Sequence, residues 1–260
     1  MSDTPHEEAK FCTELQHDNL SESLAAAVKE NPDNIFTPTS GAGRSLLSEA
    51  LMSMDAPLVA VLFQKTWKPG RTLRIAFLGD VNNTVRDGII SFAKQWLDHV
   101  NLRFDFVSGS SGDIRISTTP GGSWSYIGTD ALTIPAAEPT MNYGWLTPST
   151  PEKEYSRVVL HEFGHALGAI HEHQHPGVAI PWDRDAVYRY YARQGWSREQ
   201  VDNNIFRRYE SSQLNNSAYD RNSIMHYAIP NELTIGDFEV DWNTVLSPMD
   251  KSHFARIYPR

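Results

Sequence analysis

Three histidines in one short run constrain this chain more than any other feature. His161 and His165 stand four residues apart in the run HEFGHALGAIH, so on a helix both imidazoles face the same small volume. Gly168 permits a left-handed residue that ends the helix, after which His171 can turn back as a third nitrogen ligand. Three protein ligands leave zinc one open position for water, as in catalytic zinc sites. The motif therefore predicts a Zn²⁺ ion held by His161, His165 and His171.

Glu162 follows the first of these histidines and is predicted to be a general base rather than a ligand. From this position its carboxylate can take a proton from the water that attacks a carbonyl and pass it to the leaving amine. Zinc lowers the pKa of its bound water toward about 7 and polarises the carbonyl oxygen. The alternatives are an ordinary exposed helix glutamate and a fortuitous spacing of the three histidines.

Composition and charge exclude several classes of protein. Of 260 residues, 40% are hydrophobic and 21% are charged, and no apolar run approaches the roughly 18 residues that span a bilayer. The net charge of -9 is opposite to the basic surface that nucleic acids require, so no nucleic-acid partner is expected. Cys12 is the single cysteine, which excludes an internal disulfide. The start of the chain lacks the features of a classical secretory signal.

The first 65 residues are predicted to form an extension that packs against or regulates a catalytic domain over 66–260. A stretch rich in Thr, Pro, Ser and Gly over 37–43 is typical of a linker. Helices are expected in this extension from Glu7 to Leu15, from Ser21 to Lys29 and from Ser45 to Met54.

The catalytic domain is predicted to be of the α+β class, with an upper lobe over about 66–168 and an irregular lower lobe over about 169–260. A helix over 85–100 would back a twisted, mostly parallel sheet, and a helix over 151–167 would carry the zinc motif. The five strands of the sheet are expected at 73–77, 103–107, 113–118, 123–128 and 140–146. Further helices are expected at 182–194, 197–206 and 250–258.

Three runs of the sequence resemble the astacin family of zinc endopeptidases, within the metzincin clan. The zinc motif together with Glu172 is similar to the family's metal-binding pattern, and SIMHY over 223–227 is similar to its Met-turn. The stretch from Ser123 to Gly128 resembles the edge strand above the family's substrate cleft. The resemblance covers about Trp67 to Arg260.

The resemblance implies a metzincin fold and the zinc-dependent hydrolysis of peptide bonds in proteins or peptides. Met225 would form an apolar floor under the histidines. Tyr227 would be a displaceable fifth ligand that then helps to hold the transition-state oxyanion, a role that suits a phenol near zinc. The alternative for Tyr227 is a core tyrosine in a turn. Substrate would add as a strand to the sheet edge at 123–128, and we expect a monomer.

Several features depart from the family pattern. Astacins usually carry two disulfides, whereas Ser123 takes the place of one expected cysteine. A thiolate from an N-terminal segment could cap zinc and keep the enzyme latent, but nothing around Cys12 matches that context, so a free thiol is favoured. The run from Phe77 to Asp80 matches the Phe-x-Gly-Asp signature of an inhibitory propeptide, yet it ends a predicted strand, which favours coincidence.

Other histidines near the motif are expected to have roles other than ligation. His173 and His175 suit solvent or the surroundings of the ligands, and His226 suits a structural role. The segment after His173 is longer than the family's common form, so no cleavage preference is carried over.

The family implies an extracellular enzyme, while the absent signal and the single cysteine leave the cytoplasm or a non-classical export route open.

Two other classes of function stay open from the sequence. One is a noncatalytic binding module on the same scaffold, which the retention of Glu162 opposes because a binding protein needs no base. The other is a zinc hydrolase that acts on a non-peptide amide. Dependence of hydrolysis on peptide length would count against that second class.

Overall fold

One mixed sheet organises the chain, which the computed structural model describes over residues 10, 12–35, 64–209 and 218–260. The six strands lie in the order β1-β5-β6-β4-β2-β3. Neighbours are parallel except β5 and β6, which are antiparallel. The strands are β1 (Cys12–Leu15), β2 (Thr72–Phe77), β3 (Arg103–Val107), β4 (Ile114–Ser117), β5 (Ser123–Tyr126) and β6 (Met141–Tyr143). The predicted α+β class and the mostly parallel sheet are confirmed.

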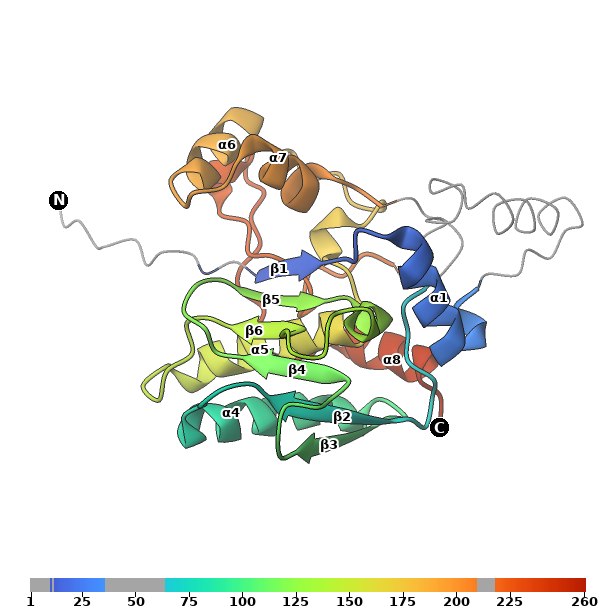
Figure 1. Ribbon diagram of the computed structural model, residues 1–260. Helices are drawn as coiled ribbons and strands as arrows, with labels where there is room; N and C mark the ends of the chain where they lie inside the picture. Colours follow the sequence, from blue (N-terminus) through green and yellow to red (C-terminus); the bar gives the residue numbers. More distant parts are fainter. Residues whose placement is uncertain (1–9, 11, 36–63, 210–217) are drawn as a thin grey trace, which may run out of the picture.

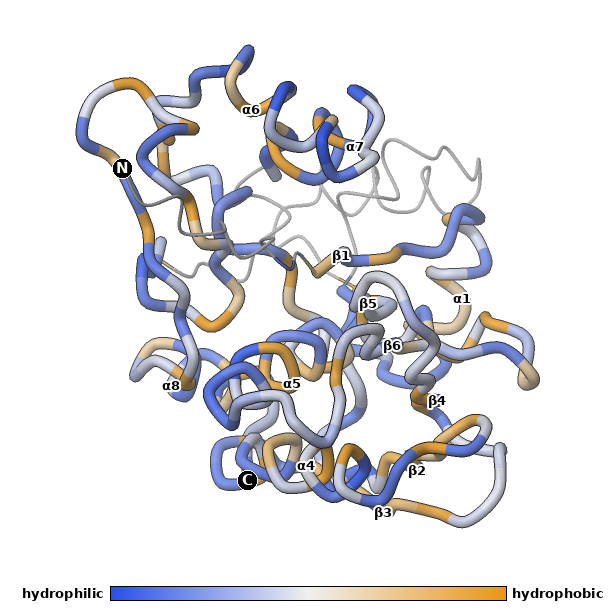
Figure 2. The backbone as a smooth tube through the Cα atoms, turned by 90° about the vertical axis from the view of Figure 1, so that its left-hand side faces the viewer, coloured by the Kyte–Doolittle hydropathy of each residue, from blue (hydrophilic) through white to orange (hydrophobic). Residues whose placement is uncertain are grey.

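Two helices cover one face of this sheet and lie side by side, as Figures 1 and 2 show. Helix α4 (Asn83–Ala93) begins at Asn82, whose side chain accepts a hydrogen bond from the Thr84 amide. The predicted helix over 85–100 continues past α4 only as a 3₁₀ helix, Lys94–Asp98. Helix α5 (Glu152–Ala166) carries the zinc motif, and every residue from Tyr155 to Ala166 is buried. Its position is therefore determined by packing on all sides.

The main core joins the sheet to the last helix of the chain. Phe163 of α5 packs against Phe104 of β3 with ring centroids 5.5 Å apart. Trp96 packs against Phe254 at 4.5 Å, which brings α8 (Pro248–Ile257) against the end of α4. Ser247 and Asp250 form a capping box at the start of α8. The predicted closing helix is thus present and packs into the main core.

The segment over 169–260, the predicted lower lobe, has a small hydrophobic core of its own. Helices α6 (Arg184–Ala192) and α7 (Arg198–Val201) stand above the sheet in Figure 1, and a π-helical turn, Asp202–Phe206, follows them. Their core includes Tyr227, so this cluster reaches the metal motif. Short 3₁₀ helices lie at Pro32–Asn34, Gly128–Leu132, Glu172–Gln174 and Asn231–Leu233.

The N-terminal extension contributes a strand where a helix was predicted. The helix expected from Glu7 to Leu15 is wrong over Cys12–Leu15, which forms β1 and pairs in parallel with Ser123–Tyr126 of β5. An open sheet edge offers unpaired amide and carbonyl groups, and satisfying them outweighs a weak helical preference. Figure 1 shows β1 at this edge. The sheet therefore has six strands rather than the five predicted.

The second predicted helix of the extension is present as α1 (Leu20–Glu30). Buried Asp130 anchors it, because this carboxylate accepts hydrogen bonds from the Ser23 hydroxyl and the His17 amide and pairs with Lys65 at 2.6 Å. The expected linker over 37–43 and helix over 45–54 lie outside the described residues. No helix in the described part of the chain is long and apolar enough to cross a membrane.

Candidate active site and metal centre

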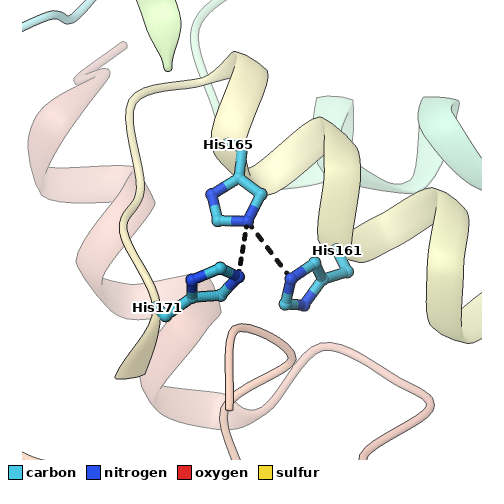
Figure 3. A group of neighbouring side chains, drawn as sticks. All are labelled: His161, His165 and His171. Carbon is cyan, nitrogen blue, oxygen red and sulfur yellow. Dashed lines mark hydrogen bonds between the residues drawn. The ribbon is translucent and has the colours of Figure 1, made fainter. Parts of the chain in front are cut away.

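The three motif histidines meet at one point, as Figure 3 shows. The Nε2 atom of His165 lies 3.2 Å from Nε2 of His161 and 3.1 Å from Nε2 of His171. Helix α5 supplies the first two side chains from successive turns, and Gly168, at φ +101°, lets the chain leave the helix and return His171 to the same place. All three side chains are buried. The spacing seen in the sequence thus corresponds to a cluster of three imidazoles in the folded chain.

Hydrogen bonds on the far side of two rings determine which nitrogen carries the proton. Nδ1 of His161 lies 2.8 Å from the Ile224 carbonyl oxygen, and Nδ1 of His165 lies 2.9 Å from that of Ala169. A carbonyl only accepts, so each Nδ1 donates its proton and each Nε2 presents a lone pair. Lone pairs this close repel unless a cation lies between them. These residues therefore fit zinc, which takes nitrogen ligands in this number in catalytic sites.

Burial also keeps the three imidazoles in the form that binds metals. Desolvation, followed by the proximity of the other histidines, places the pKa of His161 and of His171 well below the usual value. Desolvation likewise lowers the pKa of His165. Neutral imidazole is the metal-binding state, because a protonated ring has no free lone pair.

Glu162 is fully buried beside this cluster, which excludes the alternative of an exposed helix glutamate. Neither carboxyl oxygen makes an aligned hydrogen bond with a described residue. Burial raises the pKa of Glu162 to about 8, although the nearby Cys12 thiol and the Arg157 guanidinium act in the opposite direction. A buried carboxyl group with a pKa of about 8 suits a group that exchanges protons with a substrate and water.

The predicted Met-turn lies directly under the motif helix. Met225 is buried, and its carbonyl oxygen accepts a hydrogen bond from the Glu172 amide at 3.0 Å, which ties the turn to the end of the motif. A β-carbon placed on Gly164 of α5 would lie 2.2 Å from the Met225 sulfur. The turn and the helix are therefore in close contact at the glycine between His161 and His165.

Tyr227 is buried in the core of the lower lobe, just after the Met-turn, and also lies against the histidines. Its ring centroid is 4.4 Å from that of His171 and 6.1 Å from that of His161. The ring of His173 stacks on that of Tyr227, with centroids 4.6 Å apart. The Tyr227 hydroxyl donates a hydrogen bond to the backbone carbonyl oxygen of Cys12. The phenol is thus close to the metal centre, with its hydroxyl held by the N-terminal extension.

The remaining histidines near the motif do not join the cluster. His173 is buried, and its Nε2 lies 2.8 Å from the Asn204 carbonyl oxygen, so it supports the surroundings of the ligands. His175 is buried next to the cluster, and its Nδ1 accepts a hydrogen bond from the Gly177 amide at 2.9 Å. His226 contacts the Tyr219 hydroxyl through Nε2 at 2.9 Å. Asp80, which ends the Phe-x-Gly-Asp run, is exposed after β2.

A half-buried carboxyl group, that of Glu172, lies next to the third histidine of the motif. Glu172 accepts a hydrogen bond from the Asp220 amide at 2.7 Å, and burial raises its pKa to about 8. It borders a cavity of about 200 Å³ that His171, Met225 and Asp250 also line. The metal centre therefore adjoins a cavity on this side.

Two residues of the extension that sequence reasoning did not place here also belong to the site. Cys12 is a free, buried thiol beside Glu162, where burial and the Glu162 charge raise its pKa well above the usual value. Glu14 accepts a hydrogen bond from the backbone amide of His171 at 3.1 Å. A possible signal was the strand-like alternation around Thr13, but a run this short does not distinguish a strand from a helix.

The mixed sheet, its motif helix and the site built on them place the protein among the zinc metalloendopeptidases. The model of the Astacin peptidase family matches residues 61–237. The chain therefore belongs to the astacin family, in agreement with the resemblance seen in its motifs. A search of curated proteins found no match.

Solved structures agree with this family. A structure described as that of myroilysin is 47% identical, with a TM-score of 0.73, over 75% of this chain and 96% of that chain. A crystal structure of myroilysin is 38% identical, with a TM-score of 0.64, over 98% of this chain and 93% of that chain. High choriolytic enzyme 1 is a hatching enzyme zinc-protease from Oryzias latipes (Medaka fish). Its structure is 18% identical, with a TM-score of 0.50, over 75% of this chain and 94% of that chain. At this identity, the comparison shows a shared fold alone.

Proposed function

We propose that residues 66–260 form a catalytic domain that hydrolyses internal peptide bonds of proteins or peptides, with zinc held by His161, His165 and His171. The observation that carries this proposal is the convergence of three Nε2 atoms beside a buried carboxyl group without aligned hydrogen-bond partners among the described residues. Zinc, when bound, would lower the pKa of a water molecule and polarise the scissile carbonyl group.

The side chains around the metal would carry the proton transfers. Glu162 takes a proton from the attacking water and delivers it to the amine nitrogen as the peptide bond breaks. The Tyr227 hydroxyl, once released from the Cys12 carbonyl oxygen, can donate a hydrogen bond to the oxyanion that develops on the substrate. Met225 supports the three ligands from below through its contact with Gly164.

The test is zinc analysis combined with digestion of a peptide library by the wild type and by Glu162→Ala. Both proteins are expected to bind one zinc ion, and only the wild type is expected to cut. Glu199→Gln, which changes an exposed glutamate of α7, is the matched control and should cut like the wild type. If Glu162→Ala binds zinc and cuts as well as the wild type, the mechanism is wrong. Cutting that is independent of peptide length would favour a non-peptide amidase.

We also propose that residues 1–65 regulate this domain by occupying the substrate position. The sheet edge at which substrate was expected to add is taken by β1, which pairs with all four residues of β5. The same strand holds the Tyr227 hydroxyl and places Cys12 beside Glu162. Peptide turnover by the full chain and by a chain starting at Ala56 would test this role. Equal turnover would contradict it.

A further inference from the structure

The three metal-binding imidazoles are supported unequally by the catalytic domain. Nδ1 of His161 and Nδ1 of His165 each face a backbone carbonyl oxygen of that domain, at 2.8 Å and 2.9 Å. Nδ1 of His171 is buried and makes no aligned hydrogen bond with any residue in the described part of the chain. The third ligand therefore lacks a support that the other two have.

Glu14 of the extension is the charged group that faces this ring. Its Oε2 atom accepts a hydrogen bond from the His171 backbone amide at 3.1 Å and lies 3.3 Å from His171 Nδ1. Its Oε1 atom accepts a hydrogen bond from the Tyr209 hydroxyl at 2.6 Å. The Glu14 side chain is 9% exposed. One carboxylate thus contacts both the backbone and the imidazole of a predicted metal ligand.

We propose that Glu14 is a positioning residue that completes the metal site from the extension, so that zinc binding and docking of β1 stabilise each other. A carboxylate that faces the distal nitrogen of a ligating histidine fixes its tautomer and orientation and raises its basicity. Because Glu14 belongs to the strand paired with β5, this support is present only while that strand is docked. The proposal rests on the proposed zinc site.

The coupling is required to act in both directions. If docked β1 strengthens zinc binding by a given factor, bound zinc strengthens the docking of β1 by the same factor. Removal of a carboxylate of this kind typically weakens metal affinity by about 10- to 100-fold. The extension would therefore both cover the cleft and retain the metal, and its departure would leave His171 with one supporting contact fewer.

Zinc affinity, measured by competition with a chromophoric chelator, tests the first direction. All proteins carry Glu162→Gln so that self-cleavage does not interfere. Adding Glu14→Ala is expected to lower zinc affinity by about 10- to 100-fold. Adding Glu14→Gln keeps an acceptor oxygen for the His171 amide but removes the charge, so a smaller loss is expected. The matched control is Glu22→Gln, which changes an exposed glutamate of α1 in the same extension and should leave zinc affinity unchanged.

Hydrogen exchange at the backbone amides of 12–15 tests the second direction. Zinc is expected to slow this exchange with Glu14 in place and to have little effect in Glu14→Ala. Tyr209→Phe removes the hydrogen bond from the Tyr209 hydroxyl to Glu14 while leaving the contacts of Glu14 with His171, so it is expected to keep most of the zinc affinity.

The outcomes separate this inference from the proposed function. If the protein with Glu14 intact binds no zinc, the proposed function itself fails. If it binds zinc and both Glu14 variants bind equally well, the role of Glu14 is refuted while the zinc site stands. An equal loss in Glu22→Gln would also refute it, since the effect would then belong to the extension in general.

Discussion

Gly164 offers a sharp test of how the motif helix and the Met-turn fit together. An alanine β-carbon at this position would lie 2.2 Å from Met225 Sδ, 3.2 Å from Met225 Cε and 3.5 Å from Trp96 Cζ2. Nonbonded atoms pack at about 3.5 to 4 Å, so the sulfur has to move by more than about 1 Å. The sulfur lies within the side chain rather than at its tip. Gly164→Ala should therefore push the turn away from α5.

Two opposing effects determine the magnitude of this change. Alanine stabilises a helix interior by about 1 kcal/mol relative to glycine. Overpacking of a well-packed core costs about 1 to 3 kcal/mol, and a contact this short lies at the upper end of that range. We expect Gly164→Ala to lower the free energy of unfolding by about 2 kcal/mol. Zinc affinity should fall as well, because His161 and His165 flank the displaced position.

Urea unfolding of the metal-free protein measures this effect, and Met225→Ala supplies the matched background. Without the sulfur, the new methyl group meets no short contact with residue 225, and the helix preference of alanine remains. Gly164→Ala should then be neutral or stabilising by up to about 1 kcal/mol relative to Met225→Ala alone. The reasoning is refuted if Gly164→Ala stabilises the protein in both backgrounds.

Three further predictions concern the site and the extension. Burial raises the pKa of Glu162 from its ordinary value of 4.5 to about 8, so the folded metal-free protein holds a proton that the unfolded chain releases. The free energy of unfolding of the metal-free protein should therefore fall as pH rises from 4.5 to 8. In urea unfolding, Glu162→Gln should remove at most about 5 kcal/mol of this pH-dependent loss. A pH profile that Glu162→Gln leaves unchanged would contradict the buried carboxyl group. Tyr227→Phe should lower kcat by about 100-fold with KM little changed in peptide kinetics, whereas an unchanged kcat would exclude an oxyanion role. Asp130→Ala removes the ion pair with Lys65 and the acceptor for the Ser23 hydroxyl and the His17 amide, so it should destabilise the full chain by about 3 kcal/mol in thermal unfolding, while wild-type stability would show that these contacts are dispensable.

Local patterns in the sequence predicted the catalytic domain well. Apolar alternation in Thr72–Phe77 and helical spacing in Asn83–Ala93 each reflect the face that an element buries, and that face is encoded by nearby residues. The five predicted strands of this domain are all present. His161 and His165 were expected to converge because helix geometry alone brings residues four apart together. The return of His171 was expected from the turn that Gly168 permits. These strands, this helix and this histidine spacing could be predicted because few long-range contacts are needed to form them.

The tertiary structure alone decided the role of the extension. Whether Cys12–Leu15 is a strand depends on the open edge of β5, more than a hundred residues away, and no local preference encodes that partner. The support of His171 by Glu14 and the hydrogen bond that holds the Tyr227 hydroxyl both come from the same docking. The sequence by itself determined which residues could bind zinc and break a peptide bond. Long-range packing determined which groups surround those residues, because contacts between distant segments form only in the folded chain.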